Sequence, residues 1–276
     1  AGLVIGEGWH KQFGGPHAEP DAIASVVDRS LLSESTMYVN LEPCSHFGKT
    51  PPCADLLIRE KINRVVISND DPNPLVAGSG IKRLTEAGIE VITGVLAETG
   101  RFLNRRFFTA IKHKRPYVIL KWAETSDGFI ARSSYDSKWI SNEYSRKLVH
   151  RWRAEEDAIL VGRQTAMSDN PKLTVREWTG KNPVRIVIVS SLNLSPSLHL
   201  FTDGLPTLCY NLLKAQQSGN VEFVKLSPAN FIQELLDDLH ARNIGSLIVE
   251  GGTQTINHFI ECERWDEARV FVSTER

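Results

Sequence analysis

Two stretches near the start of this chain carry the side-chain types that bind zinc. His17 supplies an imidazole, and Cys44 and Cys53 supply thiols that bind metal as thiolates. Glu19 lies two residues after His17, where its carboxylate can take up and release protons beside a metal ion. Pro43 directly precedes the first cysteine. This combination predicts a metal centre equipped with a proton-transfer group, as a metal-assisted hydrolytic reaction requires.

The order of these residues is that of zinc-dependent deaminases acting on nucleobase-like rings, which carry H-x-E followed by P-C and a further cysteine. Three protein ligands leave the fourth zinc position to water, which the metal acidifies toward a pKa of about 7. Two alternatives stay open. One is a structural zinc site with His46 as the fourth ligand, and the other is a packed histidine and two thiols without metal. The interval between Cys44 and Cys53 is longer than the usual spacing of about two to four residues.

The composition is that of an ordinary globular protein. Of the 276 residues, 41% are hydrophobic and 24% are charged, and this length corresponds to about two domains. The formal net charge is −1 and no run of Lys and Arg stands out, which disfavours a nucleic-acid partner. The apolar stretches have the length of strands, so no membrane span is predicted. Besides the two cysteines of the metal motif, Cys209 and Cys262 are expected to be reduced thiols, which predicts a cytoplasmic location.

The first half alternates strand-like and helix-like segments, which predicts an α/β layer. Strands are expected at residues 3–5, 37–41, 64–68 and 90–93, and helices at residues 17–28, 54–60 and 80–87. In this arrangement His17 begins one helix with Glu19 on its first turn, and Cys53 directly precedes another. The start of that helix would stabilise Cys53 as a thiolate.

The second half restarts the pattern after a basic linker at residues 112–116. Strands are expected at residues 117–122, 158–161, 185–189, 207–210, 222–226 and 246–250, and helices at 141–154, 230–242 and 253–261. We therefore expect an N-terminal domain at residues 1–114 and a C-terminal domain at residues 115–276. Gly251 and Gly252 separate a strand from a helix, where the backbone can approach a ligand and the helix N-terminus favours phosphate.

Longer runs around these residues resemble a known family. In the first half they are GGPHAE at 14–19, LEPCSHFGKTPPC at 41–53, DPNP at 71–74 and VAGSG at 76–80. In the second half they are KWA at 121–123, SDG at 126–128, SKWI at 137–140, GRQT at 162–165, DNPKLTVR at 169–176 and VEGG at 249–252. With these motifs in this order, essentially the whole chain resembles the RibD family, the bifunctional deaminase–reductases of riboflavin biosynthesis.

The resemblance implies an α/β protein with a cytidine-deaminase-like N-terminal domain and a dihydrofolate-reductase-like C-terminal domain. It implies zinc-dependent hydrolytic deamination of 2,5-diamino-6-ribosylamino-4(3H)-pyrimidinone 5′-phosphate, followed by NADPH-dependent reduction of the ribosyl side chain to ribityl. The implied cofactors are Zn²⁺ and NADPH. The implied partner is a small phosphorylated pyrimidine, with neither nucleic acid nor membrane, and the expected assembly is a homo-oligomer, either a dimer or a tetramer.

The resemblance also assigns roles to individual residues, with Glu19 as the catalytic residue and His17, Cys44 and Cys53 as the metal ligands. Substrate contacts are implied for His46, Lys49, Ser137, Arg153, Leu173, Arg176 and Glu250. NADPH contacts are implied for Ala123, Trp139, Thr165, Asp169, Gly252, Thr253, Gln254, Thr255 and Ile256. Several of these fit plainer roles as well: loop stabilisation for His46 and Lys49, core packing for Trp139, and surface ion pairs for the arginines. Asp71 and Asn73 either border the deaminase site or shape a turn.

Members of the RibD family begin with a further helix and strand and continue with further reductase strands, so both domains are expected to be incomplete in this chain.

Three other functions are alternatives to a bifunctional enzyme. A nucleic-acid deaminase is disfavoured by the net charge of −1 and leaves the second half unexplained. A non-enzymatic module is disfavoured by Glu19, which a structural zinc site does not need. A protein in which only one half is active stays open.

Overall fold

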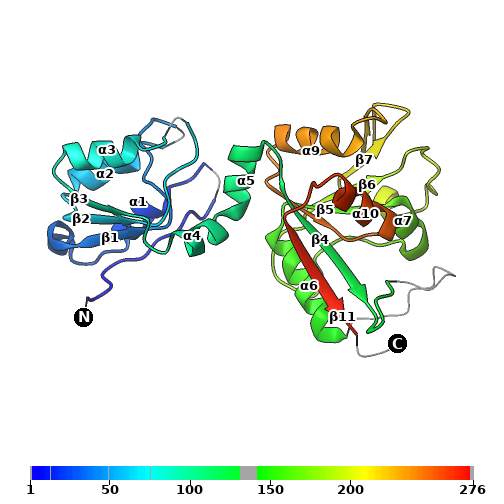
Figure 1. Ribbon diagram of the computed structural model, residues 1–276, viewed down its shortest axis with the longest axis horizontal. Helices are drawn as coiled ribbons and strands as arrows, with labels where there is room; N and C mark the ends of the chain where they lie inside the picture. Colours follow the sequence, from blue (N-terminus) through cyan, green and yellow to red (C-terminus); the bar gives the residue numbers. More distant parts are fainter. Residues whose placement is uncertain (1, 13, 49, 75, 131–141, 274–276) are drawn as a thin grey trace. The chain divides into compact units, whose positions relative to one another are not determined.

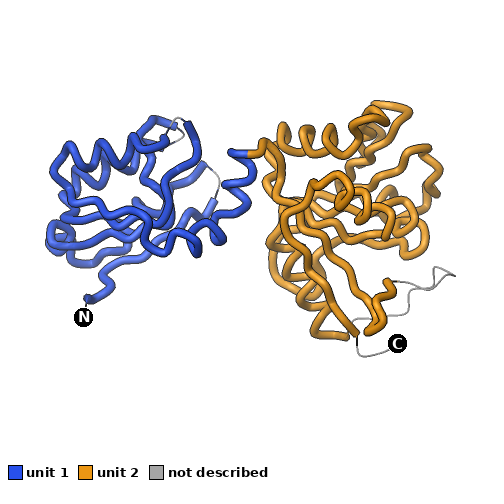
Figure 2. The backbone as a smooth tube through the Cα atoms, viewed as in Figure 1, with its two compact units in different colours: residues 1–112 blue, residues 113–276 orange. Residues whose placement is uncertain are grey.

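The chain folds as two compact units, residues 1–112 and residues 113–276 (Figure 2). The structure is a computed structural model, and it describes residues 2–12, 14–48, 50–74, 76–130 and 142–273. Lys49, Ser137 and Trp139 lie outside the described residues. Within the described part of the chain, no helix has the length and apolar character needed to cross a membrane.

The first unit is built on a small parallel sheet in the order β1-β2-β3 (Figure 1). Its elements are α1 (Ala18–Ala24), a short 3₁₀ helix (Arg29–Glu34), β1 (Thr36–Val39), α2 (Cys53–Arg59), β2 (Arg64–Ile67), α3 (Ser79–Glu86), β3 (Glu90–Thr93), α4 (Ala97–Leu103) and α5 (Arg105–His113). The central strand β2 is apolar and almost wholly buried, as a strand covered on both faces must be. Ile23, Leu57 and Leu84 pack with it into one hydrophobic core.

The expected strand at residues 3–5 is wrong, because this segment has no regular secondary structure. It lies along α1 instead of pairing with a strand. The backbone N–H of Glu7 donates to Ser25 Oγ at 2.9 Å. Gly8 approaches the helix so closely that a Cβ there would lie 2.2 Å from the backbone nitrogen of Ala22. Apolar alternation alone did not reveal that this segment packs against a helix.

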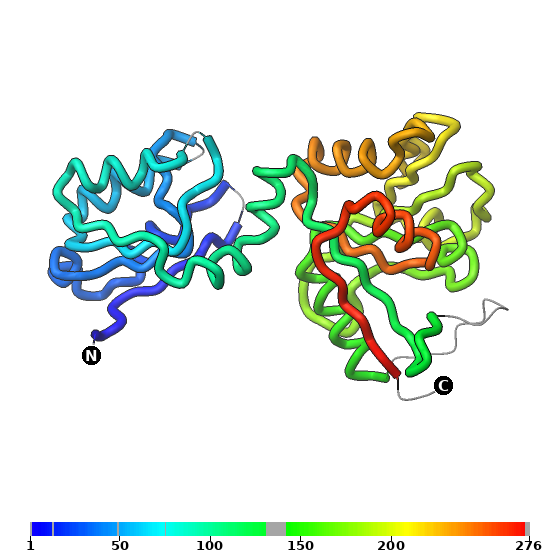
Figure 3. The backbone as a smooth tube through the Cα atoms, in the orientation of Figure 1, coloured from blue at the N-terminus to red at the C-terminus, as the bar shows by residue number. Residues whose placement is uncertain are grey.

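The second unit is built on a larger sheet in the order β11-β4-β10-β5-β6-β7-β9-β8, parallel except for β8 at one edge. Its strands are β4 (Tyr117–Glu124), β5 (Ala158–Gly162), β6 (Val184–Ile188), β7 (Thr207–Asn211), β8 (Gln216–Ser218), β9 (Val221–Lys225), β10 (Ser246–Val249) and β11 (Glu267–Val272). Figure 3 shows β11, in red, beside β4, in green, although the two are far apart in sequence. The carboxyl ends of β4, β10 and β5 therefore meet at one edge of the sheet.

Helices cover both faces of this sheet. They are α6 (Glu143–Glu155), α7 (Arg163–Asp169), α8 (His199–Thr202), α9 (Phe231–Ala241) and α10 (Thr253–Glu261). Alternate residues of β5 enter different cores: Leu160 packs with side chains of α9 and α10, whereas Ile159 packs with side chains of α6, α7 and α8. Because both faces are covered, the central strands β5, β6 and β10 are mostly apolar and buried, whereas the edge strand β8 is exposed and the edge strand β11 alternates between partly buried and exposed residues.

Four α-helices of the described residues were not expected from the sequence, and the short α8 is one of them. α4 and α5 occupy residues 97–113, so the basic segment expected to be a linker begins inside a helix. α7 occupies residues 163–169, where no element was expected. It follows β5 without a connecting loop, and only Ala166 of this helix is buried. A single buried residue is too little for a helical pattern of apolar residues to be recognised.

Candidate active sites

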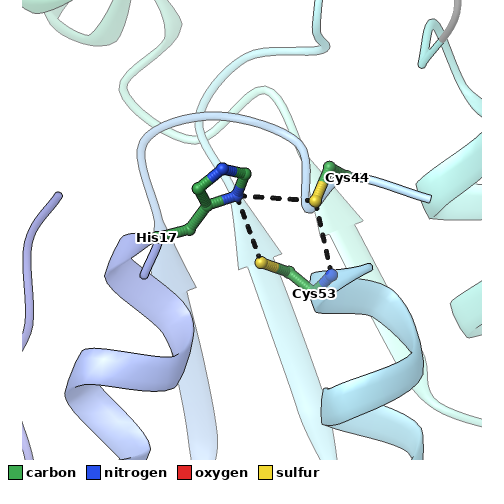
Figure 4. Close-up of side chains that lie close together, drawn as sticks. All are labelled: His17, Cys44 and Cys53. Atoms are coloured by element: carbon green, nitrogen blue, oxygen red, sulfur yellow. Dashed lines mark hydrogen bonds between the residues drawn. The ribbon is translucent and has the colours of Figure 1, made fainter. Parts of the chain in front are cut away.

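The side chains of His17, Cys44 and Cys53 converge at the N-terminal ends of α1 and α2 (Figure 4). His17 is the residue before α1, and Cys53 is the first residue of α2. Cys44 comes from the loop that follows β1, and the N–H of Cys53 donates to its sulfur at 3.3 Å. Their candidate ligand atoms all lie within 4.8 Å of one another. The fold thus brings together three ligands from separate parts of the sequence.

The spacing of these atoms fits zinc. A tetrahedral ion with bond lengths of about 2.0 Å to nitrogen and about 2.3 Å to sulfur holds those ligand atoms about 3.5 Å apart. His17 Nδ1 lies 3.5 Å from Cys44 Sγ and 3.4 Å from Cys53 Sγ. Among the described residues His46 does not join this group, so the arrangement favours a three-ligand centre over a four-ligand structural site.

The thiol groups of Cys44 and Cys53 differ in pKa. The hydrogen bond with Cys53 lowers the pKa of Cys44 to about 5, and the same contact raises the pKa of Cys53. A lowered pKa favours the thiolate form of Cys44, which is the form that binds metal. A divalent ion would displace the remaining thiol proton, because thiolates are the form of cysteine that bind metals.

Glu19 lies on the first turn of α1 beside this group. Only 8% of the residue is exposed, and burial raises the pKa of its carboxyl group. The Cys53 sulfur is one of its hydrogen-bond partners. A buried carboxyl with a raised pKa next to a metal centre is suited to accept a proton and pass it on.

A cavity of about 1390 Å³ opens beside the group, and His17, Glu19, Cys44 and His46 line it. Asp71 and Asn73 line the same cavity, and the N–H of Asn73 donates to the Asp71 carboxylate at 2.8 Å. Asp71 and Asn73 therefore meet both expectations from the sequence, because they border the cavity and also shape a turn. His46 Nδ1 is buried and has no hydrogen-bond partner within the described chain, which leaves it available to a ligand.

His10 is a cavity residue that the sequence analysis did not single out. It lines the same large cavity and also an adjoining smaller one of about 230 Å³, together with His17, Cys44 and His46. Its ring meets that of His17 edge to face at 5.4 Å, and its Nδ1 lies 2.9 Å from Pro16 O. The only signal in the sequence was a second histidine seven residues before His17, in an irregular segment.

Comparisons with known proteins agree on one family. Residues 1–69 match the model of the cytidine and deoxycytidylate deaminase zinc-binding region, and residues 116–274 match the RibD C-terminal domain. The riboflavin biosynthesis protein RibD of Aquifex aeolicus is 40% identical over 279 residues, which cover 99% of this chain and 78% of that protein. The chain belongs to the RibD family. RibD of Escherichia coli is 33% identical with the same coverage of both chains.

Solved structures of RibD proteins superpose on the whole chain. A diaminohydroxyphosphoribosylaminopyrimidine deaminase/5-amino-6-(5-phosphoribosylamino)uracil reductase of Thermotoga maritima is 40% identical, with a TM-score of 0.89 over 99% of this chain and 77% of that one. RibD of Acinetobacter baumannii is 32% identical, with a TM-score of 0.87 over 98% and 77%. The first unit is therefore a cytidine-deaminase-like domain and the second a dihydrofolate-reductase-like RibD C-terminal domain, as the sequence predicted.

In the RibD C-terminal domain, several described residues that are expected to contact NADPH lie at the carboxyl edge of the central strands, where parallel α/β sheets bind ligands. Ala123 lies near the end of β4 and Thr165 on α7, and the expected run 252–256 forms the N-terminal cap and first turn of α10. Asp169, also expected to contact NADPH, is the last residue of α7. The residue as a whole is exposed, but the protein around its carboxyl group removes part of the solvent and so raises the pKa.

The backbone at this edge is closely packed around its glycines. Gly162 N–H donates to Gly251 O at 2.7 Å, which joins β5 to the loop before α10. Gly251 has a φ of +116°, in the region that favours glycine. Thr165 Oγ1 lies 3.2 Å from where a Cβ of Gly252 would stand. A helix N-terminus behind a glycine pair is a suitable cradle for a pyrophosphate.

Two residues expected to contact substrate, Arg153 and Glu250, bind each other. Arg153 Nε and Nη2 donate to the two oxygens of Glu250 at 2.8 and 2.7 Å, and both side chains are nearly buried. Lys121 Nζ lies 3.9 Å from the same carboxylate. Burial alone would raise the pKa of Glu250, but the charges of Arg153 and Lys121 lower it to about 2. The plainer expectation of a surface ion pair is wrong for Arg153.

Leu173 and Arg176, the other residues expected to contact substrate, differ in exposure. Leu173 is 1% exposed and its side chain belongs to the core, so only its backbone can face a ligand. Arg176 is exposed, and its Nη1 donates to Thr174 Oγ1 at 3.1 Å. His150, which the sequence analysis passed over, accepts a hydrogen bond from the backbone N–H of Arg176 at its Nδ1.

Proposed function

We propose that this chain catalyses two consecutive steps of riboflavin biosynthesis. The first is zinc-dependent deamination of 2,5-diamino-6-ribosylamino-4(3H)-pyrimidinone 5′-phosphate, and the second is NADPH-dependent reduction of the resulting ribosylaminouracil phosphate to its ribityl form. Membership of the RibD family supports both steps, and the name of the Thermotoga maritima relative describes the same pair of activities.

The observation that carries the deaminase assignment is the convergence of His17, Cys44 and Cys53 beside the buried Glu19. A zinc ion held by these three ligands supplies Lewis acidity to a water molecule. With zinc in place, the Glu19 carboxylate would take one proton from water and pass it to the ring nitrogen, and it would pass the second proton, from the added hydroxyl group, to the amine, which leaves as ammonia. Its burial against a ligand sulfur excludes bulk water from the proton path.

In this proposal the cavity walls orient the pyrimidine. His46 Nδ1 is assigned a contact with substrate, because it is buried without a partner in the described chain. Asp71 and Asn73 lie on the same cavity, where a carboxylate can accept hydrogen bonds from ring amino groups. Lys49 is kept as the predicted partner of the substrate phosphate.

For the reductase step, the glycine pair and the start of α10 are assigned to the cofactor pyrophosphate. NADPH supplies the hydride, and the chain's own residues position the reactants. The Glu250 carboxylate is held in place by Arg153 and Lys121 at the carboxyl end of β10. It is kept as a predicted contact of the substrate. Exposed Arg176 is assigned to the substrate phosphate, which a guanidinium can bind with two parallel hydrogen bonds.

A product assay by mass spectrometry tests the proposal. The purified, zinc-loaded chain is given the diaminopyrimidinone ribosylamine phosphate with and without NADPH. We expect the deaminated product without NADPH and the ribityl product with it. No deaminated product from protein that contains stoichiometric zinc would contradict the proposed deaminase activity. Deamination without subsequent reduction would leave only the first half active.

The assembly and location of the protein stay predictions. A homo-oligomer, either a dimer or a tetramer, is expected, and light scattering on the purified protein would measure its mass. A cytoplasmic location follows from the cysteine usage alone, and fractionation of cells with a tagged chain would test it.

A further inference from the structure

Glu42 carries a buried carboxylate that no step of the proposed reaction uses. The residue is 3% exposed and stands two positions before the metal ligand Cys44. Four backbone N–H groups donate to its side chain: those of Asp71 and Gly78 to Oε2 at 3.2 and 3.0 Å, and those of Gly80 and Ile81 to Oε1 at 2.9 and 3.2 Å. One carboxylate therefore accepts hydrogen bonds from residues 71–81 at both of its oxygens.

These bonds join two parts of the deaminase site. Gly78, Gly80 and Ile81 belong to the cap and first turn of α3, where a negative charge is favourable. Asp71 begins the turn that faces the cavity with Asn73. On the other side, the main chain of Glu42 donates to Asn69 O at 2.9 Å and continues directly into Pro43 and Cys44.

Further contacts hold α3 against the ligand loop. A Cβ on Gly80 would lie 2.0 Å from Pro43 O, so the helix and the loop touch along their backbones. Ser45 Oγ lies 2.6 Å from Ser79 Oγ, and Arg83 Nη1 donates to Ser45 O at 3.0 Å. The residues on both sides of Cys44 are thus fixed to α3, and Glu42 contributes the largest share of the hydrogen bonds.

We propose that Glu42 is a positioning residue of the deaminase centre, which sets Cys44 and the Asp71 turn relative to one another. This inference rests on the proposed deaminase function. A carboxylate is needed because all four partners are donors, and both oxygens of an ionised carboxyl group accept. Glutamine would place an amino group against two of the four N–H groups, although its size is unchanged.

The test compares Glu42→Gln with Glu90→Gln in the zinc-loaded chain of 276 residues. Glu90 lies in the same unit, where its half-exposed carboxylate pairs with Arg64, so the chemical change is matched. Zinc release to a colorimetric chelator and the deaminase kcat and KM are measured well below the unfolding temperature. For Glu42→Gln we expect zinc release faster by on the order of 10- to 100-fold and a raised KM, as for other residues that orient metal ligands. Glu90→Gln should match the wild type in both.

A second variant covers the case in which Glu42→Gln does not fold. Gly80→Ala keeps the carboxylate but pushes α3 away from Pro43, and we expect the same direction of change in zinc release and KM. If a folded Glu42→Gln protein is merely less stable, with wild-type zinc release and KM, the positioning role is wrong. Zinc release tests the role of Glu42 even if the wild-type chain shows no deaminase activity. An inactive wild type would count against the proposed function and not against the positioning role of Glu42.

Discussion

Burial makes Glu19 the most informative single residue of the first unit. We expect Glu19→Gln to abolish deamination, a loss of at least about 100-fold, because an amide cannot take a proton from water. Zinc content should stay at the wild-type level, since the proposed ligands are His17, Cys44 and Cys53 and not Glu19. Reduction of the deaminated intermediate with NADPH is the internal control and should be unchanged. Both rates are read from one mass-spectrometric time course, and a loss of both would contradict independent sites.

In the second unit, Glu250 has a pKa that links the candidate reductase site to acid stability. Its carboxyl pKa falls from 4.5 to about 2 in the fold. A depressed pKa stabilises the folded state above the unfolded value, and this contribution is lost as the pH falls from about 4.5 toward 2. Glu250→Gln removes the contribution and leaves Arg153 buried without its partner, which costs about 3–5 kcal/mol near pH 7.

Urea unfolding at several pH values measures this effect. The free energy of unfolding should differ between the wild type and Glu250→Gln by a constant amount near neutral pH. This difference should shrink below pH 4.5, where the carboxyl group of the unfolded chain begins to take up a proton. Glu222→Gln is the matched control, because Glu222 also pairs bidentately with an arginine but its side chain is 38% exposed. That change should cost no more than about 1 kcal/mol. A gap for Glu250→Gln that does not depend on pH would contradict the lowered pKa.

At the scale of elements, the junction of β5 and α10 depends on Gly162. A Cβ at this position would lie 2.2 Å from Thr255 Oγ1 on the first turn of α10. We expect Gly162→Ala to destabilise the second unit by about 1–3 kcal/mol. The displaced helix start should also raise the Kd for NADPH by roughly tenfold, about 1.4 kcal/mol. Thermal unfolding and a fluorescence titration measure the two effects.

Removing the clashing atom checks this explanation. Thr255→Ala takes away Oγ1, so the double variant should be more stable than Gly162→Ala alone. Zinc content and deamination should stay at the wild-type level in all three variants, because both residues lie in the second unit. A double variant that is no more stable than Gly162→Ala would show that the helix contact does not set the cost.

The sequence predicted elements best where local pattern decides them. β3 and α10 were predicted with their observed bounds, because β3 lies between Gly88 and Gly94, and Gly252 directly precedes the helical pattern of α10. The grouping of His17, Cys44 and Cys53 was also predictable, since the residue types and their order are those of a zinc site. Contacts between distant segments were not: nothing local shows that Arg153 binds Glu250, or that four N–H groups converge on Glu42. Leu173 stays a predicted substrate contact, but the position of its side chain in the core was not predicted, and the contact would have to come from its backbone.

At the scale of the whole molecule, the two units have separate hydrophobic cores. One core contains only residues between Ile5 and Val91, and the other two contain only residues between Tyr117 and Phe259. No core cluster of the described residues draws on both units. Each unit should therefore unfold by its own cooperative transition, since cooperativity follows the shared core.

Ligand binding should stabilise these transitions one at a time. In the proposed function, zinc binds the folded first unit and NADPH the folded second, so each ligand should raise the unfolding temperature of its own unit. We expect chelation of zinc to lower one calorimetric transition and leave the other in place. NADPH at about 100 times its Kd should stabilise the other transition by about 2.7 kcal/mol. Cys44→Ser provides the control, because it should remove the response to zinc and keep the response to NADPH. A single transition that responds to both ligands would show that the units unfold together and that their separate cores do not make them independent.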